Sequence, residues 1–324
     1  MATNSGGRAR PWITAAKIAA TAAVLVLLLS RIDPGRTLAL WGRLRPGPAL
    51  VAIALLAPNL ACQYGRWRVG LRRAHPRARP TEAFRALLIG TAMAAVTPGS
   101  VGEFGQVMFL SPGGRRPMLG VLAISRLYVF FVAVAIGVGM WIYLPWLLRV
   151  SFETACAAGA AILAGMIAYV AAGEWFLRAP DRPFVARFVR RVPGLAPAFE
   201  GVKAVRVSDR ARFMGWSLAL ELVFQTQLVW LARAFGAEVA WLPGIAAGAV
   251  ATGIVSLLPP VTLGSVGVRE SAAVVVWHQL GVAAPVAFNA AFSLFLLNVA
   301  VPGVVGLAWN AARAESAEGE EAAP

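Results

Sequence analysis

Two long apolar stretches of this chain are each interrupted by a similar segment rich in proline and glycine. The first segment is Thr97–Glu103 (TPGSVGE) and the second is Pro260–Glu270 (PVTLGSVGVRE). Both contain GSVG, and both place a carboxylate after the break. Within a lipid bilayer, helices are broken only where the freed backbone is enclosed by protein or lines a water-filled cavity. The sequence therefore predicts two interrupted elements that border a binding site.

Composition places these stretches in a membrane. The 324 residues are 59% hydrophobic and 14% charged, whereas a globular protein carries about 25% charged residues. Net charge is +15, but the arginines cluster beside apolar stretches. This pattern fits the positive-inside rule and an anionic lipid surface, and it argues against nucleic acid. Cys62 and Cys156 lie inside apolar segments and suggest neither a disulfide nor a metal site.

Spans of about 20 apolar residues are needed to cross a bilayer. Full spans are predicted over residues 12–30, 48–65, 117–146, 151–173, 213–235 and 284–310. The basic N-terminus with no cleavage site indicates that the first is a retained span. We expect one all-α membrane domain over residues 1–314, followed by a disordered acidic tail over 315–324.

The interrupted stretches 82–110 and 241–281 are predicted to be re-entrant hairpins. The first arm, 82–96, would be about 22 Å long as a helix, short of a hydrocarbon core of roughly 30 Å. If both stretches are re-entrant and both termini are cytoplasmic, most of the 30 basic residues face the cytoplasm, as the positive-inside rule requires. The predicted location is the cytoplasmic (inner) membrane.

Three full spans separate the two hairpins, so we expect them to enter from opposite faces as an inverted repeat. Chance similarity of four small residues is the alternative. In the basic linker 174–212, residues 184–192 are typical of an amphipathic helix on anionic lipid. An ordinary solvated connector would have the same charge.

The candidate lipid-binding residues flank the two breaks or lie deep in a neighbouring span. A helix that starts after a break can hold a phosphate at its positive end, and buried charges are usually paired or face a cavity. Glutamates at helix starts also act as caps, which is the alternative for Glu103 and Glu270. Arg126 is expected to pair with Glu103 or with a lipid phosphate; a purely structural ion pair is the alternative. The candidates are Gly99, Ser100, Gly102, Glu103, Arg126, Gly264, Ser265, Gly267, Arg269 and Glu270.

Two pairs of polar residues, Glu221 with Gln225 and Asn59 with Gln63, share a helix face at i, i+4. We expect these pairs to link helices by hydrogen bonds more than to touch a substrate. No catalytic, cofactor-binding or metal-binding motif is present in the sequence.

The breaks also carry a family resemblance. Pro98–Glu103, Arg126, and Pro260–Glu270 ending in GVRE resemble the transmembrane-region family of lysylphosphatidylglycerol synthases, over residues 12–310. The resemblance implies paired re-entrant helices and movement of a charged or isoprenoid lipid between leaflets. The family commonly has an arginine where Gly99–Val101 stand and a basic residue where Gln106 stands. A less charged headgroup is therefore admitted, and the soluble aminoacyl-transferring domain is absent from the sequence.

We therefore expect a non-enzymatic lipid flippase without cofactors that carries a phospholipid or an isoprenoid-type lipid through a midplane site. The alternatives are a non-transporting scaffold of a lipid or cell-envelope pathway, and a membrane-embedded lipid-modifying or glycosyl-transferring enzyme. A homo-oligomer or a lipid-pathway enzyme as partner remains open.

Overall fold

The computed structural model of the chain describes residues 33–97, 101–111, 115–178, 187, 196–258, 262 and 265–321. Four predicted features lie outside these residues. They are the first span (12–30), the amphipathic segment (184–192, apart from Arg187), and the centres of the two breaks with Gly99, Ser100 and Gly264.

Every regular element in the described part of the chain is helical, so the predicted all-α membrane class is confirmed. In chain order the helices are α2 (Pro34–Ala39), η1 (Trp41–Arg43), α3 (Pro46–Ala54), α4 (Leu56–Ala74), α5 (Pro80–Ala95), η2 (Val101–Phe109), α6 (Arg115–Tyr143), η4 (Pro145–Leu148), α7 (Phe152–Arg178), α9 (Ala196–Ala204), α10 (Val207–Ala234), α11 (Trp241–Leu257), α12 (Val268–His278), α13 (Ala284–Phe295), η5 (Leu296–Ala300) and α14 (Val301–Glu321).

Four long helical stretches are apolar enough to cross a membrane, and they coincide with four predicted spans. They are Pro46–Ala74, Arg115–Tyr143, Phe152–Leu177 and Ala284–Arg313. The predicted span 213–235 lies within α10, whose 28 residues give about 42 Å of helix, enough for a crossing. The chain is thus a multi-pass membrane protein. A disordered tail is expected from residue 315, but helix α14 continues to Glu321. The alanines and glutamates of this segment favour helix, which accounts for the difference.

Both interrupted stretches form helical hairpins too short to cross the membrane. Helix α5 has 16 residues and ends shortly before Pro98, and α11 has 17 and ends before Pro259 and Pro260. At 1.5 Å per residue neither arm exceeds about 26 Å. The return arms η2 and α12 are shorter still, with 9 and 11 residues. We call α5 with η2 the first hairpin and α11 with α12 the second hairpin.

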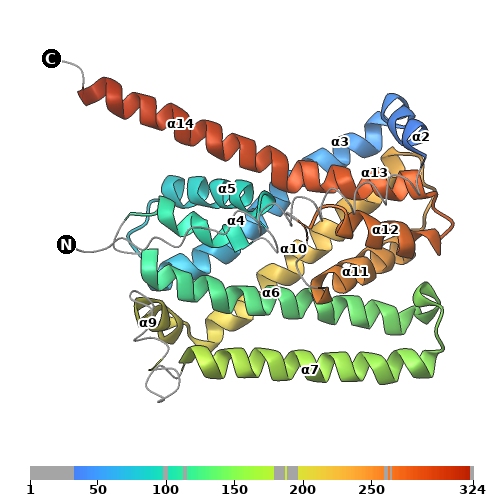
Figure 1. Cartoon of the computed structure of the whole chain (residues 1–324), viewed down its shortest axis with the longest axis horizontal. Helices are drawn as coiled ribbons and strands as arrows, with labels where there is room; N and C mark the ends of the chain where they lie inside the picture. The colour runs from blue at the N-terminus through green and yellow to red at the C-terminus, as the bar shows by residue number, and fades with distance from the viewer. Residues whose placement is uncertain are drawn as a thin grey trace.

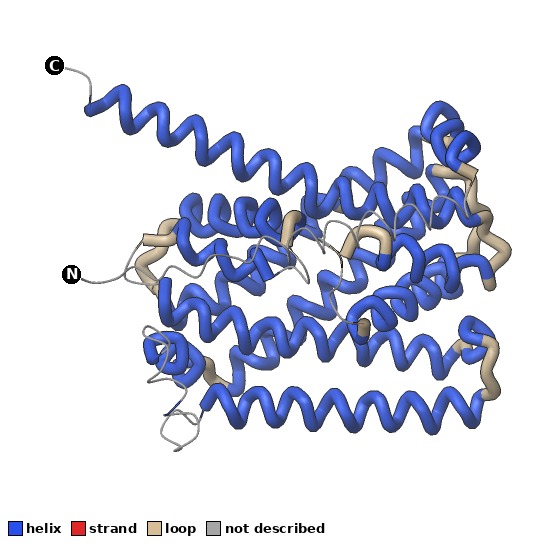
Figure 2. The backbone as a smooth tube through the Cα atoms, viewed as in Figure 1, coloured by secondary structure: helices blue, strands red, loops and turns tan. Residues whose placement is uncertain are grey.

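The hairpins extend into the bundle from opposite ends. In Figure 1 the first hairpin lies in the left half and the second in the right half, while α6, α7 and α10 run the length of the molecule. Figure 2 shows short non-helical segments near the middle of the bundle, where the hairpins turn. This arrangement places the ends of α5 and α11 that precede the breaks in the middle of the bundle, between the long helices.

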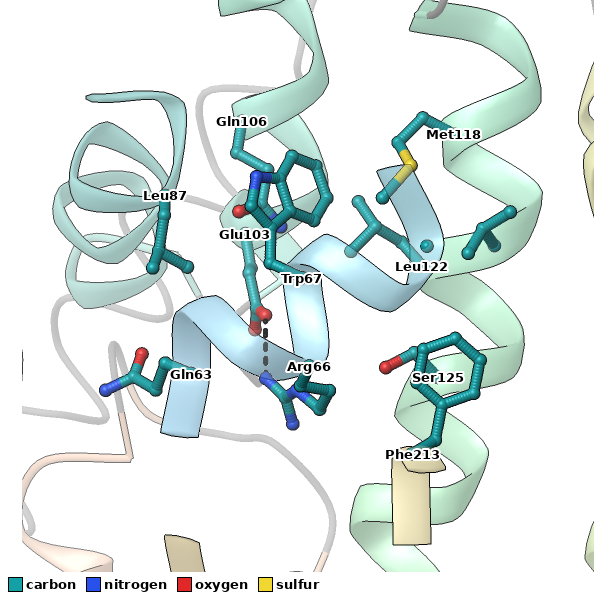
Figure 3. A pocket seen from close by; sticks show the side chains of 12 residues that line it. Gln63, Arg66, Trp67, Leu87, Glu103, Gln106, Met118, Leu122, Ser125 and Phe213 are labelled. Carbon is teal, nitrogen blue, oxygen red and sulfur yellow. Dashed lines mark ion pairs between the residues drawn. The ribbon is translucent and has the colours of Figure 1, made fainter. Parts of the chain in front are cut away.

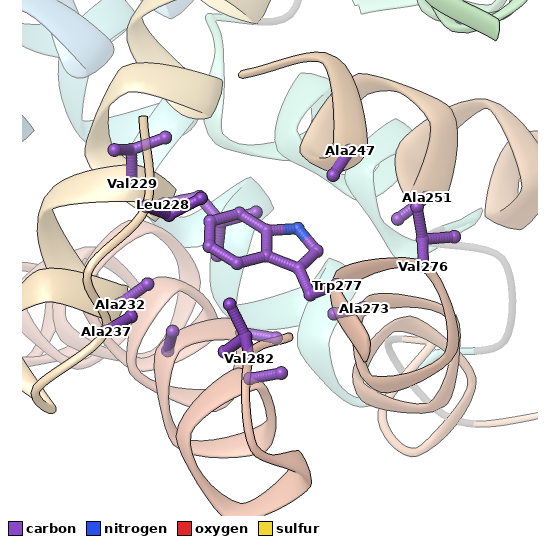
Figure 4. Packing of buried hydrophobic residues seen from close by; sticks show 14 of the residues in the cluster. Leu228, Val229, Ala232, Ala237, Ala247, Ala251, Ala273, Val276, Trp277 and Val282 are labelled. Atoms are coloured by element: carbon purple, nitrogen blue, oxygen red, sulfur yellow. The ribbon is translucent and has the colours of Figure 1, made fainter. Parts of the chain in front are cut away.

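Each hairpin packs against its own apolar core. The core of the first hairpin contains Trp67, Leu87, Met118 and Phe213. The core of the second is centred on Trp277 of α12, which is only 1% exposed and is surrounded by small and branched side chains of α10 and α11 (Figure 4). Alanines at 247 and 251 leave room for the indole, so α12 can lie close against α11.

Helices α13, η5 and α14 form one long rod that contacts both hairpins. Gly303 and Gly306 of α14 let its backbone approach Ala92 and Leu88 of α5. Its other end, α13, packs in the core of the second hairpin. The two parts join through the π-helical turn η5.

Candidate functional site

A central cavity of about 330 Å³ lies between the two hairpins. Its walls come from α4, α5, η2, α6, α10, α11, α12 and η5 and from Ser265 beside the second break. The charged side chains that line it are Arg66, Glu103, Arg126, Glu221 and Arg269. Candidate residues from both breaks therefore border this one cavity, which we also call the chamber.

Glu103 is the centre of an ion-pair cluster on the side of the first hairpin. Its carboxylate pairs with Arg126 of α6 and lies 3.5 Å from Nη2 of Arg66. Figure 3 shows Arg66 and Glu103 directed toward each other beside Gln63 and Gln106. The side chains are 11% (Arg66), 17% (Glu103) and 33% (Arg126) exposed. The predicted pairing of Arg126 with Glu103 is confirmed, and Arg126 still faces the cavity.

Sequence reasoning does not identify Arg66, because it directly follows the predicted span 48–65, where arginines are expected at the cytoplasmic side. The available signal is its spacing: Asn59, Gln63 and Arg66 stand at i, i+4 and i+7 and so share one helix face. All three line the central cavity. Gln63 donates to Asn59 Oδ1 at 2.6 Å, so this pair is joined within α4.

At the second break, Ser265 and Arg269 line the cavity and Glu270 does not. Glu270 is 0% exposed, and its Oε2 accepts the N–H of Gly267 at 2.6 Å. This is the capping contact proposed as the alternative role. Gly267 has a φ of 85° and Ser265 a φ of 59°, backbone conformations that favour glycine. The guanidinium of Arg269 lies 5.3 Å from the ring centre of Phe295.

Gly102 allows the start of η2 to pack closely against the end of α5. Its N–H donates to Thr97 Oγ1 at 2.6 Å, and that hydroxyl donates to the carbonyl of Met93 at 2.8 Å. A side-chain carbon at Gly102 would lie within 2.5 Å of the Met93 carbonyl carbon. Glycine at this position thus permits the close approach that places Glu103 at the cavity.

The wall formed by α10 and α11 carries a polar network. Gln225 Nε2 donates to Glu221 Oε1 at 2.6 Å and to Thr252 Oγ1 at 3.0 Å. Ser256 donates to the Thr252 carbonyl at 2.9 Å. The expected helix-linking role of Gln225 is confirmed by its bond to α11, whereas Glu221 itself borders the cavity.

A lateral groove of about 480 Å³ adjoins the cavity. It shares Arg126, Val129, Ala133 and Ser256 with the cavity wall. The rest of its lining is mainly apolar and comes from α6 and α7, with Phe104 of η2. Only 17% of the residues in the most apolar stretch of α7 are buried, so this helix has a largely exposed apolar surface.

The comparison with protein families agrees with a membrane architecture. The chain has no match among curated proteins. One protein family, described as "Lysylphosphatidylglycerol synthase TM region", matches residues 14–306. This match includes both hairpins, every residue of the central cavity and the lateral groove. The protein therefore belongs to the lysylphosphatidylglycerol synthase transmembrane-region family, whose function is related to membrane lipids.

Proposed function

We propose that the protein is a flippase that moves a phospholipid or an isoprenoid-type lipid between leaflets. The observation that carries the proposal is the chamber shared by the two hairpins, with three arginines and two glutamates on its walls. If all five are ionised, arginine charge exceeds carboxylate charge, and guanidinium groups suit the geometry of a phosphate. The cavity volume of about 330 Å³ falls within the range of small-molecule sites, roughly 300–1,000 Å³.

The lateral groove supports an amphiphilic substrate. An apolar chain lying between α6 and α7 would stay in a hydrocarbon-like environment while its headgroup contacts Arg126. Aromatic and aliphatic side chains such as Phe130 and Leu177 line the groove. Keeping the tail in lipid while only the headgroup enters a polar chamber avoids most of the cost of crossing the bilayer centre.

In this proposal Arg66, Arg126 and Arg269 bind the headgroup phosphate. Glu103 holds two of the arginines in place and accepts any cationic group of the lipid, while Glu270 positions Arg269 from behind by capping α12. The hairpins form an inverted repeat, and rocking of one half against the other exposes the chamber to each leaflet in turn. Both termini face the cytoplasm, in the inner membrane.

Proteoliposomes test the proposal. Fluorescent phosphatidylglycerol, phosphatidylethanolamine or polyprenyl phosphate is placed in the membrane, and the fraction bleached by external dithionite reports flipping. Wild-type protein should accelerate flipping of at least one phosphate-bearing lipid over empty vesicles, and Arg66→Leu should abolish the gain. Arg68→Leu is the matched control, because Arg68 lies on the same helix and is exposed. Equal rates for wild type and empty vesicles with all three lipids would refute the proposal.

A further inference from the structure

Glu221 differs from the other carboxylate on the cavity wall. Glu103 is paired with two arginines, whereas Glu221 has no ion-pair partner among the described residues. Its one hydrogen bond there is to the neutral amide of Gln225, through Oε1. The other oxygen, Oε2, is left without a hydrogen-bond partner in the described part of the chain.

The surroundings of Glu221 are polar but mostly uncharged. From α11 the hydroxyl residues Thr252 and Ser256 line the same cavity, and η5 contributes Asn298. Helices α3 and α13, which also pack on α10, contain no titratable residue. The charged groups that face the chamber from the remaining elements are Arg66 of α4, Glu103 of η2, Arg126 of α6 and Arg269 of α12.

An ionised carboxylate inside a membrane domain is costly unless positive charge balances it. In the described residues no arginine forms an ion pair with Glu221, and two of the three cavity arginines are paired with Glu103. An anionic headgroup bound to the arginines offsets part of their positive charge and places a further negative charge in the same cavity as Glu221. Proton binding to Glu221 then becomes more favourable, because the neutral acid avoids repulsion from the phosphate.

We propose that Glu221 takes up a proton when an anionic lipid headgroup enters the central cavity, so that lipid movement is coupled to protons. The step converts the Glu221 carboxylate and one proton, supplied by the buffer acid in solution, into a carboxylic acid, and no other bond changes. Lipid and proton favour each other's binding by linkage, since each coupling free energy is reciprocal. Lower pH should therefore favour the lipid-bound state.

Gln225 suits this role because its amide remains a donor to Glu221 in both protonation states. Its two N–H groups are occupied by Glu221 and Thr252, which holds Oε1 of Glu221 in place. Oε2 is then the oxygen available for the proton. The inference rests on the proposed function, since it assumes that the chamber receives a lipid headgroup.

Calorimetry separates the two proposals. Dihexanoyl phosphatidylglycerol is titrated into purified protein in two buffers with different ionisation enthalpies. Heat that saturates reports lipid binding, and its dependence on the buffer reports protons taken up. Wild type should bind with proton uptake, Glu221→Asp should retain uptake, and Glu221→Gln should bind without it. Glu238→Gln is the matched control, because Glu238 is an exposed carboxylate between α10 and α11.

Saturating heat with no buffer dependence in wild type, or full proton uptake in Glu221→Gln, would overturn the role of Glu221 and leave the flippase proposal standing. No binding heat in wild type would count against both proposals, since no headgroup then reaches the chamber.

Flipping of labelled phosphatidylglycerol should also speed up as the pH falls, by up to about tenfold per unit for one coupled proton. The rate of Glu221→Gln should not depend on pH over that range, and a pH dependence equal to that of wild type would overturn the role as well. The wild-type measurements need no variant, so a poorly folded Glu221→Gln does not prevent the test.

Discussion

Three glycine-to-alanine substitutions should differ in cost according to what each new methyl group meets. At Gly102 the methyl carbon would lie within 2.5 Å of the backbone carbonyl carbon of Met93. At Gly105 it would meet only the flexible end of the Met93 side chain, 2.6 Å from its sulfur. At Gly139 of α6 nothing lies within 4 Å.

The backbone at Gly102 cannot give way without separating η2 from α5, so we expect a loss near the upper end of the overpacking range, about 3 kcal/mol. Gly105→Ala should cost about 1 kcal/mol, because methionine can change rotamer. Gly139→Ala should be neutral or stabilise the protein by up to about 1 kcal/mol, since alanine favours helix over glycine.

The assay is reversible unfolding of the purified protein in mixed micelles by sodium dodecyl sulfate, followed by tryptophan fluorescence and circular dichroism. Free energies of unfolding should rank in the order Gly139→Ala, Gly105→Ala, Gly102→Ala, from most to least stable. If Gly102→Ala unfolds with the wild-type free energy, the first hairpin is not closed by the approach of Gly102 to Met93. A loss of lipid binding without loss of stability would instead favour a direct ligand role for Gly102.

Three further predictions use other contacts. A double-mutant cycle of Glu103→Gln and Arg126→Gln should give a coupling energy of about 1–3 kcal/mol in the same unfolding assay, and a value below about 0.5 kcal/mol would contradict a stabilising ion pair. Trp277→Ala should lower the free energy of unfolding by about 3–5 kcal/mol, whereas Trp146→Ala, at a tryptophan that is 45% exposed, should cost far less. In a variant without Cys62 and Cys156, Arg77→Cys and Ala283→Cys should react with a membrane-impermeant maleimide from opposite sides of the membrane; labelling from one side would contradict the opposed hairpins.

The breaks and the ion pair between Glu103 and Arg126 could be predicted because proline, glycine and isolated charges stand out in apolar sequence. The direction in which each helix face points could not be predicted. In soluble proteins an apolar face marks the core, but in a membrane both lipid and core are apolar. The sequence of α10 therefore does not show that Glu221 faces a chamber, nor that of α12 that Glu270 is turned away from it. Arg66 was missed for a related reason, since it lies near the end of a span where arginines are expected to contact lipid headgroups.

The rod built from α13, η5 and α14 limits how the two halves can move. Its C-terminal part is seated on α5 through Gly303 and Gly306, and its N-terminal part is fixed in the core around Trp277. Because the rod is packed against both hairpins, neither hairpin can tilt relative to the other without bending the rod. A π-turn is where a helix accommodates such bending most easily, and Asn298 within it also borders the chamber. Asn298 and Val299 thus belong both to the π-helical turn and to the cavity wall, so in the proposed mechanism a bound headgroup would contact the point about which the two hairpins pivot.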